Sequence, residues 1–112
     1  MRLKRFLILW VTLSSAAFSF ADDFVYDNLK YATNSDNSVT LVDGKSANGD
    51  VIIPSDVRNK NKVYVVTAIE HNAFEGNNAI TAVTIPSSVS TIGYSAFNSC
   101  KSLRRVMDAS RV

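Results

Sequence analysis

The stretch "IPSSVSTIGYSAFNSCKSLRRV" (residues 85–106) decides the fold of this 112-residue chain. Its apolar residues recur at irregular intervals that fit neither the period of a helix nor that of a strand. They do fit a unit that joins a short strand, a turn and a short helical segment, each with its own period. Val83 and Ile85 alternate as in a strand, which Pro86 ends because proline cannot donate to a sheet. "SAF" (95–97) then predicts a short α or 3₁₀ turn that places Phe97 in the core.

The same pattern occurs a second time, 23 residues earlier. Aligning "IEHNAFEGNNAITAV" (69–83) with "IGYSAFNSCKSLRRV" (92–106) gives four identities, all at apolar positions, while the polar positions differ. "VIIPSDV" (51–57) also matches "VTIPSSV" (83–89), but at an offset of 32 rather than 23, so nine extra residues lie between these units. A shared core with a variable surface is typical of stacked units, since no single unit can bury its apolar edge alone. The sequence therefore predicts a solenoid.

The segment before the repeats is predicted to be β structure. Its Asp-Gly and Asn-Gly pairs, both in "DGKSANGD" (43–50), are strong turn signals between short runs of β-branched and alternating residues. We therefore expect a β-rich N-terminal cap over residues 22–50, followed by repeats over 51–112. The expected strands lie at 24–33, 38–42, 51–54 and 63–66.

The recurring unit resembles the BspA-like class of leucine-rich repeats, whose 23-residue pattern is I-P-x-x-V-x-x-I-G-x-x-A-F-x-x-C-x-x-L-x-x-V. The first copy departs from the pattern, because Glu70 replaces the glycine and Asn77 replaces the cysteine. The resemblance covers about residues 24–106. The second copy matches every specified position, namely Ile85, Pro86, Val89, Ile92, Gly93, Ala96, Phe97, Cys100, Leu103 and Val106.

The resemblance implies a fold class and a kind of function. The fold would be an α+β repeat, in which short strands and short helical turns form a short leucine-rich-repeat solenoid behind the β-rich cap. The protein would be exported, secreted or displayed at the cell surface, and would bind a protein or glycan on host or microbial surfaces, as in adhesion. The repeat pattern contains no catalytic residue, so the resemblance implies no enzyme.

The repeat register breaks off near the end of the sequence. Carried forward by 23 residues, Ile85 and Pro86 correspond to Asp108 and Ala109, so the last of about two repeats is expected to be truncated. Solenoids generally need about three repeats and a polar cap. The chain is then either a minimal domain or a shortened relative of a longer protein, and an open last strand would invite self-association through its edge.

The first residues are predicted to form a cleaved signal peptide (residues 1–21). Basic residues precede an apolar run, and small residues lead to a cleavage site after Ala21. The alternative, a membrane anchor, is disfavoured because the run is too short to span ~30 Å of hydrocarbon. Without this leader the chain has nine basic and ten acidic side chains, a net charge of −1. This balance gives no support for nucleic-acid binding.

The residues that could take part in catalysis or metal binding are isolated from one another in the sequence. His71 has no second histidine or suitably spaced cysteine beside it, so we expect it on the surface rather than at a metal or a catalytic base. Cys100 is expected in the core, rather than as a nucleophile or in an intermolecular disulfide. "NSDNS" (34–38) lacks the ligand order of an EF-hand and is typical of turns. We therefore expect no catalytic activity, no metal and no cofactor.

A column of outward residues is the candidate binding site. The residues between the inward pairs of three strands are Ile52, Thr84 and Met107, and the repeat offset would align them. They form either a ligand contact or a surface covered by the N-terminal strands, and the sequence does not separate these readings. The protein is therefore either a binding module or a structural repeat fragment without its own ligand. The flanking residues of the column are Asp50, Ala82 and Arg105.

Overall fold

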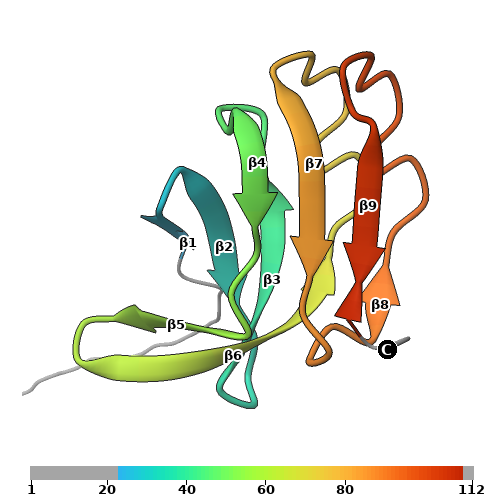
Figure 1. Cartoon of the computed structure of the whole chain (residues 1–112). Helices are drawn as coiled ribbons and strands as arrows, with labels where there is room; N and C mark the ends of the chain where they lie inside the picture. The colour runs from blue at the N-terminus through green and yellow to red at the C-terminus, as the bar shows by residue number, and fades with distance from the viewer. Residues whose placement is uncertain (1–22, 110–112) are drawn as a thin grey trace, which may run out of the picture.

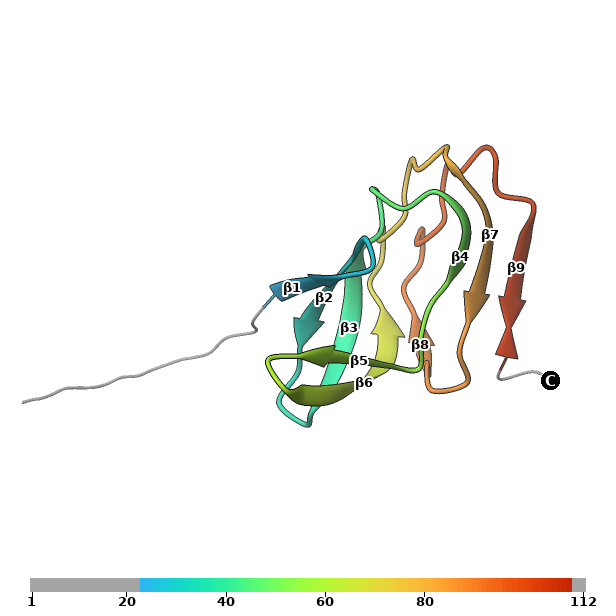
Figure 2. The ribbon, with the colours of Figure 1, turned by 60° about the vertical axis from the view of Figure 1, so that its left-hand side comes forward.

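The computed structural model describes residues 23–109, so the predicted signal peptide lies outside the described residues. This part of the chain forms two sheets. One is a mixed six-stranded sheet in the order β1-β2-β3-β6-β5, with β8 also paired to β6, and the other is a three-stranded sheet in the order β4-β7-β9. The sheets face each other as two layers (Figure 1, Figure 2). The strands are β1 (Asp23–Tyr26), β2 (Leu29–Thr33), β3 (Ser38–Asp43), β4 (Gly49–Ile52), β5 (Asp56–Asn59), β6 (Lys62–Ile69), β7 (Ile80–Ile85), β8 (Thr91–Ile92) and β9 (Arg105–Asp108).

The chain begins with an antiparallel meander of β1, β2 and β3. Asp27 and Asn28 form the first turn with positive φ values of 54° and 66°. Asp and Asn tolerate this left-handed conformation, and it suits a two-residue hairpin because its twist matches that of the strands. β3 then pairs with β6 in parallel, and Leu41 lies opposite Ile69. The strands predicted in this segment are confirmed.

The nine extra residues between the first two units form a hairpin. β5 and β6 pair antiparallel around a turn at Lys60 and Asn61, whose φ values are also positive. The hairpin projects sideways from the stack of repeats (Figure 1). Val57 still points into the core, so the insertion lengthens the surface without interrupting the apolar interior.

The second sheet confirms the repeat alignment. β4, β7 and β9 run parallel, and Val51, Val83 and Val106 lie in register across them. Parallel pairing is what stacked units with equal strand direction produce. The inward side chains of both sheets form one core, whose largest fully buried members are Tyr31, Phe74, Leu41, Ile53, Ile69, Ile80, Ile85, Val39, Val57, Val66 and Val83.

The predicted α+β class is wrong, because residues 23–109 contain strands and turns but no helical element. The error concerns two equivalent stretches, the first turn segment (residues 69–80) and the second turn segment (residues 92–103). A helix needs each N–H to bond within its own segment. Here Phe74 N–H instead donates to Ala96 O at 2.8 Å, and Gly76 N–H donates to Asn98 O at 2.9 Å. Positive φ values also interrupt both segments, at Asn72, Gly76, Ser95 and Ser99.

Candidate functional site

The predicted outward column exists as a geometrical feature of the parallel sheet. Ile52 lies opposite Thr84, and Thr84 lies opposite Met107, so three adjacent strands present these side chains side by side. Ile52 is 68% exposed and Met107 is 51% exposed. Thr84 between them is half-buried. The sequence offset therefore brings the three residues together as expected.

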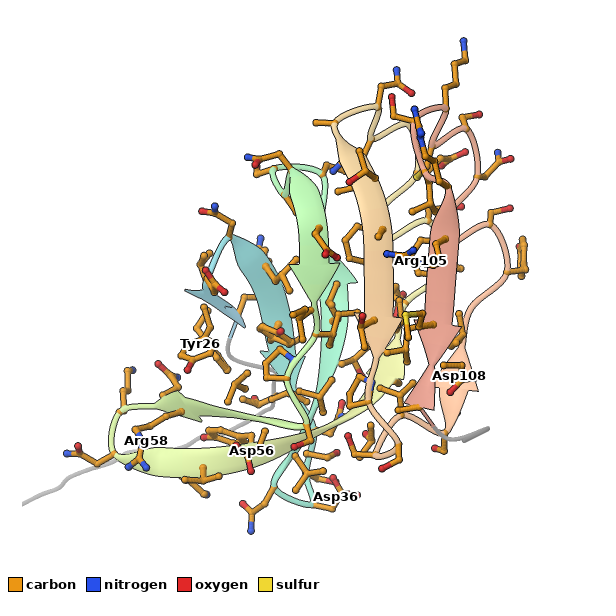
Figure 3. All side chains as sticks on the ribbon, in the orientation of Figure 1. Tyr26, Asp36, Asp56, Arg58, Arg105 and Asp108 are labelled. Atoms are coloured by element: carbon orange, nitrogen blue, oxygen red, sulfur yellow. The ribbon has the colours of Figure 1, made fainter. Side chains whose placement is uncertain are left out.

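A second row of the same sheet face carries opposite charges. Asp50 on β4 and Arg105 on β9 lie on either side of Ala82 on β7. Neighbouring strands are ~4.8 Å apart, so the two charged residues are separated by roughly 10 Å across the sheet. Arg105 extends from β9 toward β7 (Figure 3), and Ala82 is only 8% exposed. A small residue between an acid and a base leaves a shallow floor on this outer face, which we define by Asp50, Ile52, Ala82, Thr84, Arg105 and Met107.

The N-terminal strands do not cover the outer face. β1, β2 and β3 belong to the other sheet, on the opposite side of the core (Figure 2). The large exposed fractions of Ile52 and Met107 also show that these strands do not cover the face. The sequence left open whether the N-terminal strands cover this column. In the described part of the chain they do not.

Asn77 is a structural residue that the sequence comparison had treated as a simple departure from the pattern. Its side chain is buried, and its Nδ2 donates to Gly44 O at 2.9 Å and to Ala47 O at 2.8 Å. Its Oδ1 accepts from Ala79 N at 2.8 Å and from Ile80 N at 3.2 Å. The amide thereby joins the preceding loop to the start of β7. The local signal was an asparagine at a repeat position that should be buried.

Cys100 occupies the equivalent place in the second turn segment. It is half-buried, and its Sγ donates to Phe74 O at 3.0 Å. This bond reproduces the Asn77 bond to Gly44 O, one unit further along the stack. Cys100 was predicted in the core, and the structure places it against the core but only partly buried.

His71 lies on the surface, as the sequence predicts. Its ring stacks on Tyr94 with a centroid distance of 5.7 Å and an interplanar angle of 10°. Its Nδ1 lies 3.8 Å from the Glu70 carboxylate. Tyr94 is the equivalent residue of the next unit and is 80% exposed. The two rings therefore form an aromatic stack on the surface.

In the described part of the chain, Tyr31, Asp36 and Cys100 have shifted pKa values, and these three residues lie away from the outer face. Burial raises the pKa of the Tyr31 hydroxyl well above its usual range. The hydrogen bond from Ser38 lowers the pKa of Asp36. Burial also raises the pKa of the Cys100 thiol, which keeps the thiol protonated and weakly nucleophilic.

Residues 23–109 contain neither a cluster of metal-ligating side chains nor a helix suited to a membrane. No group of three or more His, Cys, Asp or Glu side chains is placed to hold a metal ion in this range. No helix within it has the length and apolarity needed to cross a membrane.

The repeat geometry agrees with a known family. The model described as "BspA type Leucine rich repeat region (6 copies)" matches residues 53–111, which is more than half of the chain. The chain belongs to the BspA-type leucine-rich repeat family.

Solved structures share this architecture. A leucine-rich cell surface protein from Faecalibacterium prausnitzii superimposes with a TM-score of 0.72 and 27% identity over 84% of this chain. A leucine-rich repeat protein from Bacteroides capillosus gives 0.69 and 33% over 77%, and one from Bacteroides ovatus gives 0.66 and 32% over 76%. The matches cover 25%, 64% and 23% of these three proteins, so the chain spans only part of their length. A comparison with curated protein sequences finds no match.

Proposed function

We propose that this protein is an exported, non-catalytic binding module whose outer face contacts a protein or a glycan at the cell surface. The observation that carries the proposal is the aligned, uncovered column of Ile52, Thr84 and Met107. Large apolar side chains exposed side by side on a rigid sheet are typical of interaction sites. Parallel strands hold their spacing, so binding such a surface costs little ordering of the protein.

The two rows of the outer face differ in chemical character. The apolar row offers Ile52 and Met107, and the charged row offers an acid and a base at opposite ends. A ligand that lies across the three strands would place an apolar group on one row and polar groups on the other. Such complementarity contributes to specificity and to the rate of association.

Family membership and the leader support export. A predicted signal peptide directs a chain out of the cytoplasm, and the related F. prausnitzii protein is described as a cell surface protein. Protease treatment of intact cells that express the full chain tests this part of the proposal. We expect the protein to be cleaved while a cytoplasmic marker stays intact, and protection of both would contradict export.

The binding test uses one substitution on each sheet. The full chain is applied to a glycan array and to a panel of immobilised extracellular proteins. Thr84→Arg places a long charged side chain in the centre of the outer face, and we expect it to reduce binding about tenfold or more, which corresponds to 1.4 kcal/mol. Thr91→Arg is the matched control, because Thr91 is an exposed threonine on β8 of the other sheet.

The outcomes separate the two functional hypotheses. Loss of binding in Thr84→Arg alone supports the outer face as the contact. Equal binding by both variants would show that the ligand contacts another part of the protein. Absence of any ligand for the folded chain would favour the alternative, a structural repeat fragment without its own ligand.

A further inference from the structure

The edge of the parallel sheet that faces the N-terminal meander lacks a strand neighbour in the described part of the chain. β4 pairs with β7 on one side only, because the sheet order is β4-β7-β9. Ile53 N–H donates to Thr84 O at 3.0 Å, which shows that the odd-numbered residues here direct their backbone groups toward β7. Backbone groups alternate along a strand, so Asp50 and Ile52 direct theirs away from β7. An unpaired edge of this kind is a template for another strand.

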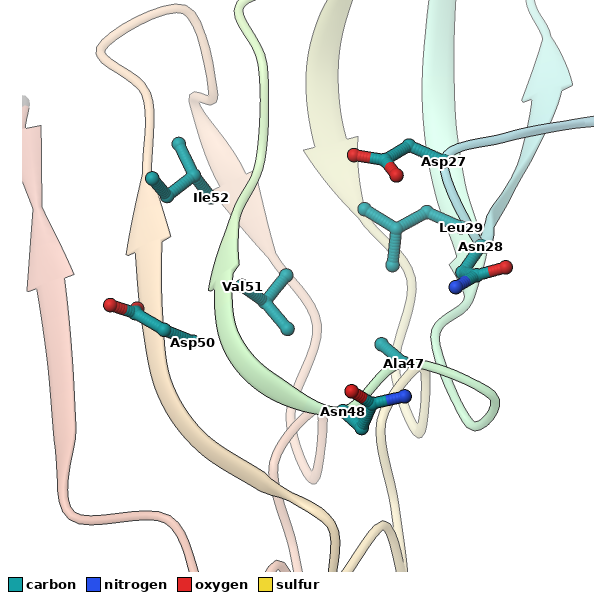
Figure 4. Close-up of a pocket in the computed structure, with 8 residues that line it drawn as sticks. All are labelled: Asp27, Asn28, Leu29, Ala47, Asn48, Asp50, Val51 and Ile52. Atoms are coloured by element: carbon teal, nitrogen blue, oxygen red, sulfur yellow. The ribbon is translucent and has the colours of Figure 1, made fainter.

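A groove runs along this free edge. It has a volume of about 250 Å³ and lies between β4 and the turn that joins β1 to β2 (Figure 4). Typical small-molecule pockets measure roughly 300–1,000 Å³ and enclose most of their ligand. The smaller, open groove suits part of an extended chain that continues beyond it. Its lining residues are Asp27, Asn28, Leu29, Ala47, Asn48, Asp50, Val51 and Ile52.

The lining combines an apolar floor with acidic walls. Leu29, Ala47 and Val51 are buried and form the floor. Asp27 and Asp50 are exposed, and the lining includes no basic residue. Asp27 lies across the groove from β4, whereas Asp50 directs its carboxylate from β4 toward the outer face, away from Val51 (Figure 4). The ion pairs found in residues 23–109 are Lys30 with Asp23 and His71 with Glu70, so neither groove carboxylate is neutralised by one of them. The groove is therefore complementary to a positively charged ligand.

We propose that the free edge of β4 binds an extended, lysine- or arginine-containing peptide segment of a partner protein as an added strand. The backbone groups of Asp50 and Ile52 supply the hydrogen bonds of the new ladder. Alternate side chains of the peptide then point toward the apolar floor or toward the outer face, as in other cases of strand addition. Basic side chains of the peptide pair with Asp27 and Asp50. This inference shares Asp50 and Ile52 with the proposed outer face, but it concerns the edge of the sheet and requires no ligand on that face.

The first test concerns charge. The probe is a short synthetic peptide in which lysine alternates with valine, and binding to the full chain is measured by fluorescence anisotropy. Asp27→Asn and Asp50→Asn should each weaken binding about two- to fivefold, the effect of an exposed ion pair. Added salt should weaken binding to the unmodified protein. Asp56→Asn is the matched control and should change nothing, because this exposed aspartate lies on β5 and outside the groove (Figure 3).

The second test concerns the backbone. Methylation of every second peptide nitrogen removes the donors that face the β4 edge in one register and spares them in the other. We expect one methylated peptide to lose binding and its register-shifted counterpart to retain it. Equal binding by both methylated peptides, or equal binding by a glutamate–valine peptide, overturns the proposal. Peptide binding by the Thr84→Arg variant is measured in parallel, so that failure at the edge is distinguished from failure at the outer face.

Discussion

The two turn segments have the same backbone path and different surroundings. Phe74 of the first turn segment is fully buried, whereas Phe97, its equivalent in the second, is only partly buried. Their rings stack with a centroid distance of 5.2 Å and an interplanar angle of 18°. At the next strand, Val83 is fully buried and Val106 is 44% exposed. Residues of one type at equivalent positions thus differ in burial across the stack.

The difference follows from the neighbours of each segment. The first turn segment lies between the loop at Gly44 and the second turn segment, and it donates or accepts hydrogen bonds on both sides. Within residues 23–109, the second turn segment has a packed neighbour on one side only. In a solenoid each unit contacts only adjacent units, so the contribution of a side chain to stability depends on its place in the stack.

The largest expected effect is a difference between two phenylalanine substitutions. Phe74→Ala removes a fully buried ring and should lower the free energy of unfolding by about 3–5 kcal/mol. Phe97→Ala should cost about half as much, because part of that ring is already exposed. Urea denaturation followed by circular dichroism measures both values. Equal losses would show that the second segment is packed as fully as the first.

Much of this comparison was accessible from the sequence, since it depends on local period and on the repeat offset. The alternation of Val83 and Ile85 predicts a strand, and the offsets correctly align Val51, Val83 and Val106. The outer-face column follows from the same two facts. These features need only residues close in sequence and one rule of stacking.

The turn geometry was predicted wrongly because isolated local turns alternate with hydrogen bonds between the two segments, and a helix does not form. Phe74 N–H bonds to Ala96 O, 22 residues away, instead of continuing a helical turn. Gly76 has a residue type that suits positive φ, but Ser95 and Ser99 adopt the same region without such a signal. The structural role of Asn77 was missed for a related reason. Its side chain bonds Gly44 and Ala47, which lie in a loop whose length differs from that of the repeat, so the repeat offset does not bring them together with Asn77.

Substitution of Asn77 is expected to have the second-largest effect. Asn77→Ala removes four hydrogen bonds, although Gly44 O keeps a second donor, Ala47 N–H, and it should cost about 2–4 kcal/mol. Cys100→Ala removes a single bond from a half-buried thiol, and should cost about 1 kcal/mol. Chemical denaturation of the two variants gives the comparison. A loss for Cys100→Ala as large as that for Asn77→Ala would contradict the unequal roles of the two segments.

Gly44 packs against the first turn segment on the side away from the second turn segment, and a substitution there tests how tightly Phe74 is enclosed. A Cβ at this position would collide with Phe74 Cε2, so the ring must move to admit even a methyl group. Gly44→Ala should therefore cost about 1–3 kcal/mol, the usual cost of overpacking. In the Phe74→Leu background the same change should cost less, because the ring is gone. A double-mutant cycle measures this coupling, and additive effects would show that the ring and the glycine are independent.

The smallest expected effect comes from transferring the asparagine to the second turn segment. In Cys100→Asn the amide can donate to Phe74 O, as Asn77 donates to Gly44 O. Its oxygen can accept from the N–H groups of Ser102 and Leu103, the equivalents of Ala79 and Ile80. The new bonds are partly exposed, and two of them replace existing bonds, from the thiol to Phe74 O and from Leu103 N–H to Cys100 O. The free energy of unfolding should therefore change by no more than about 1 kcal/mol. Denaturation midpoints of the two proteins measure the change. A gain well above this limit would mean that the second segment is as enclosed as the first, and a large loss would mean that the amide does not fit the site of the thiol.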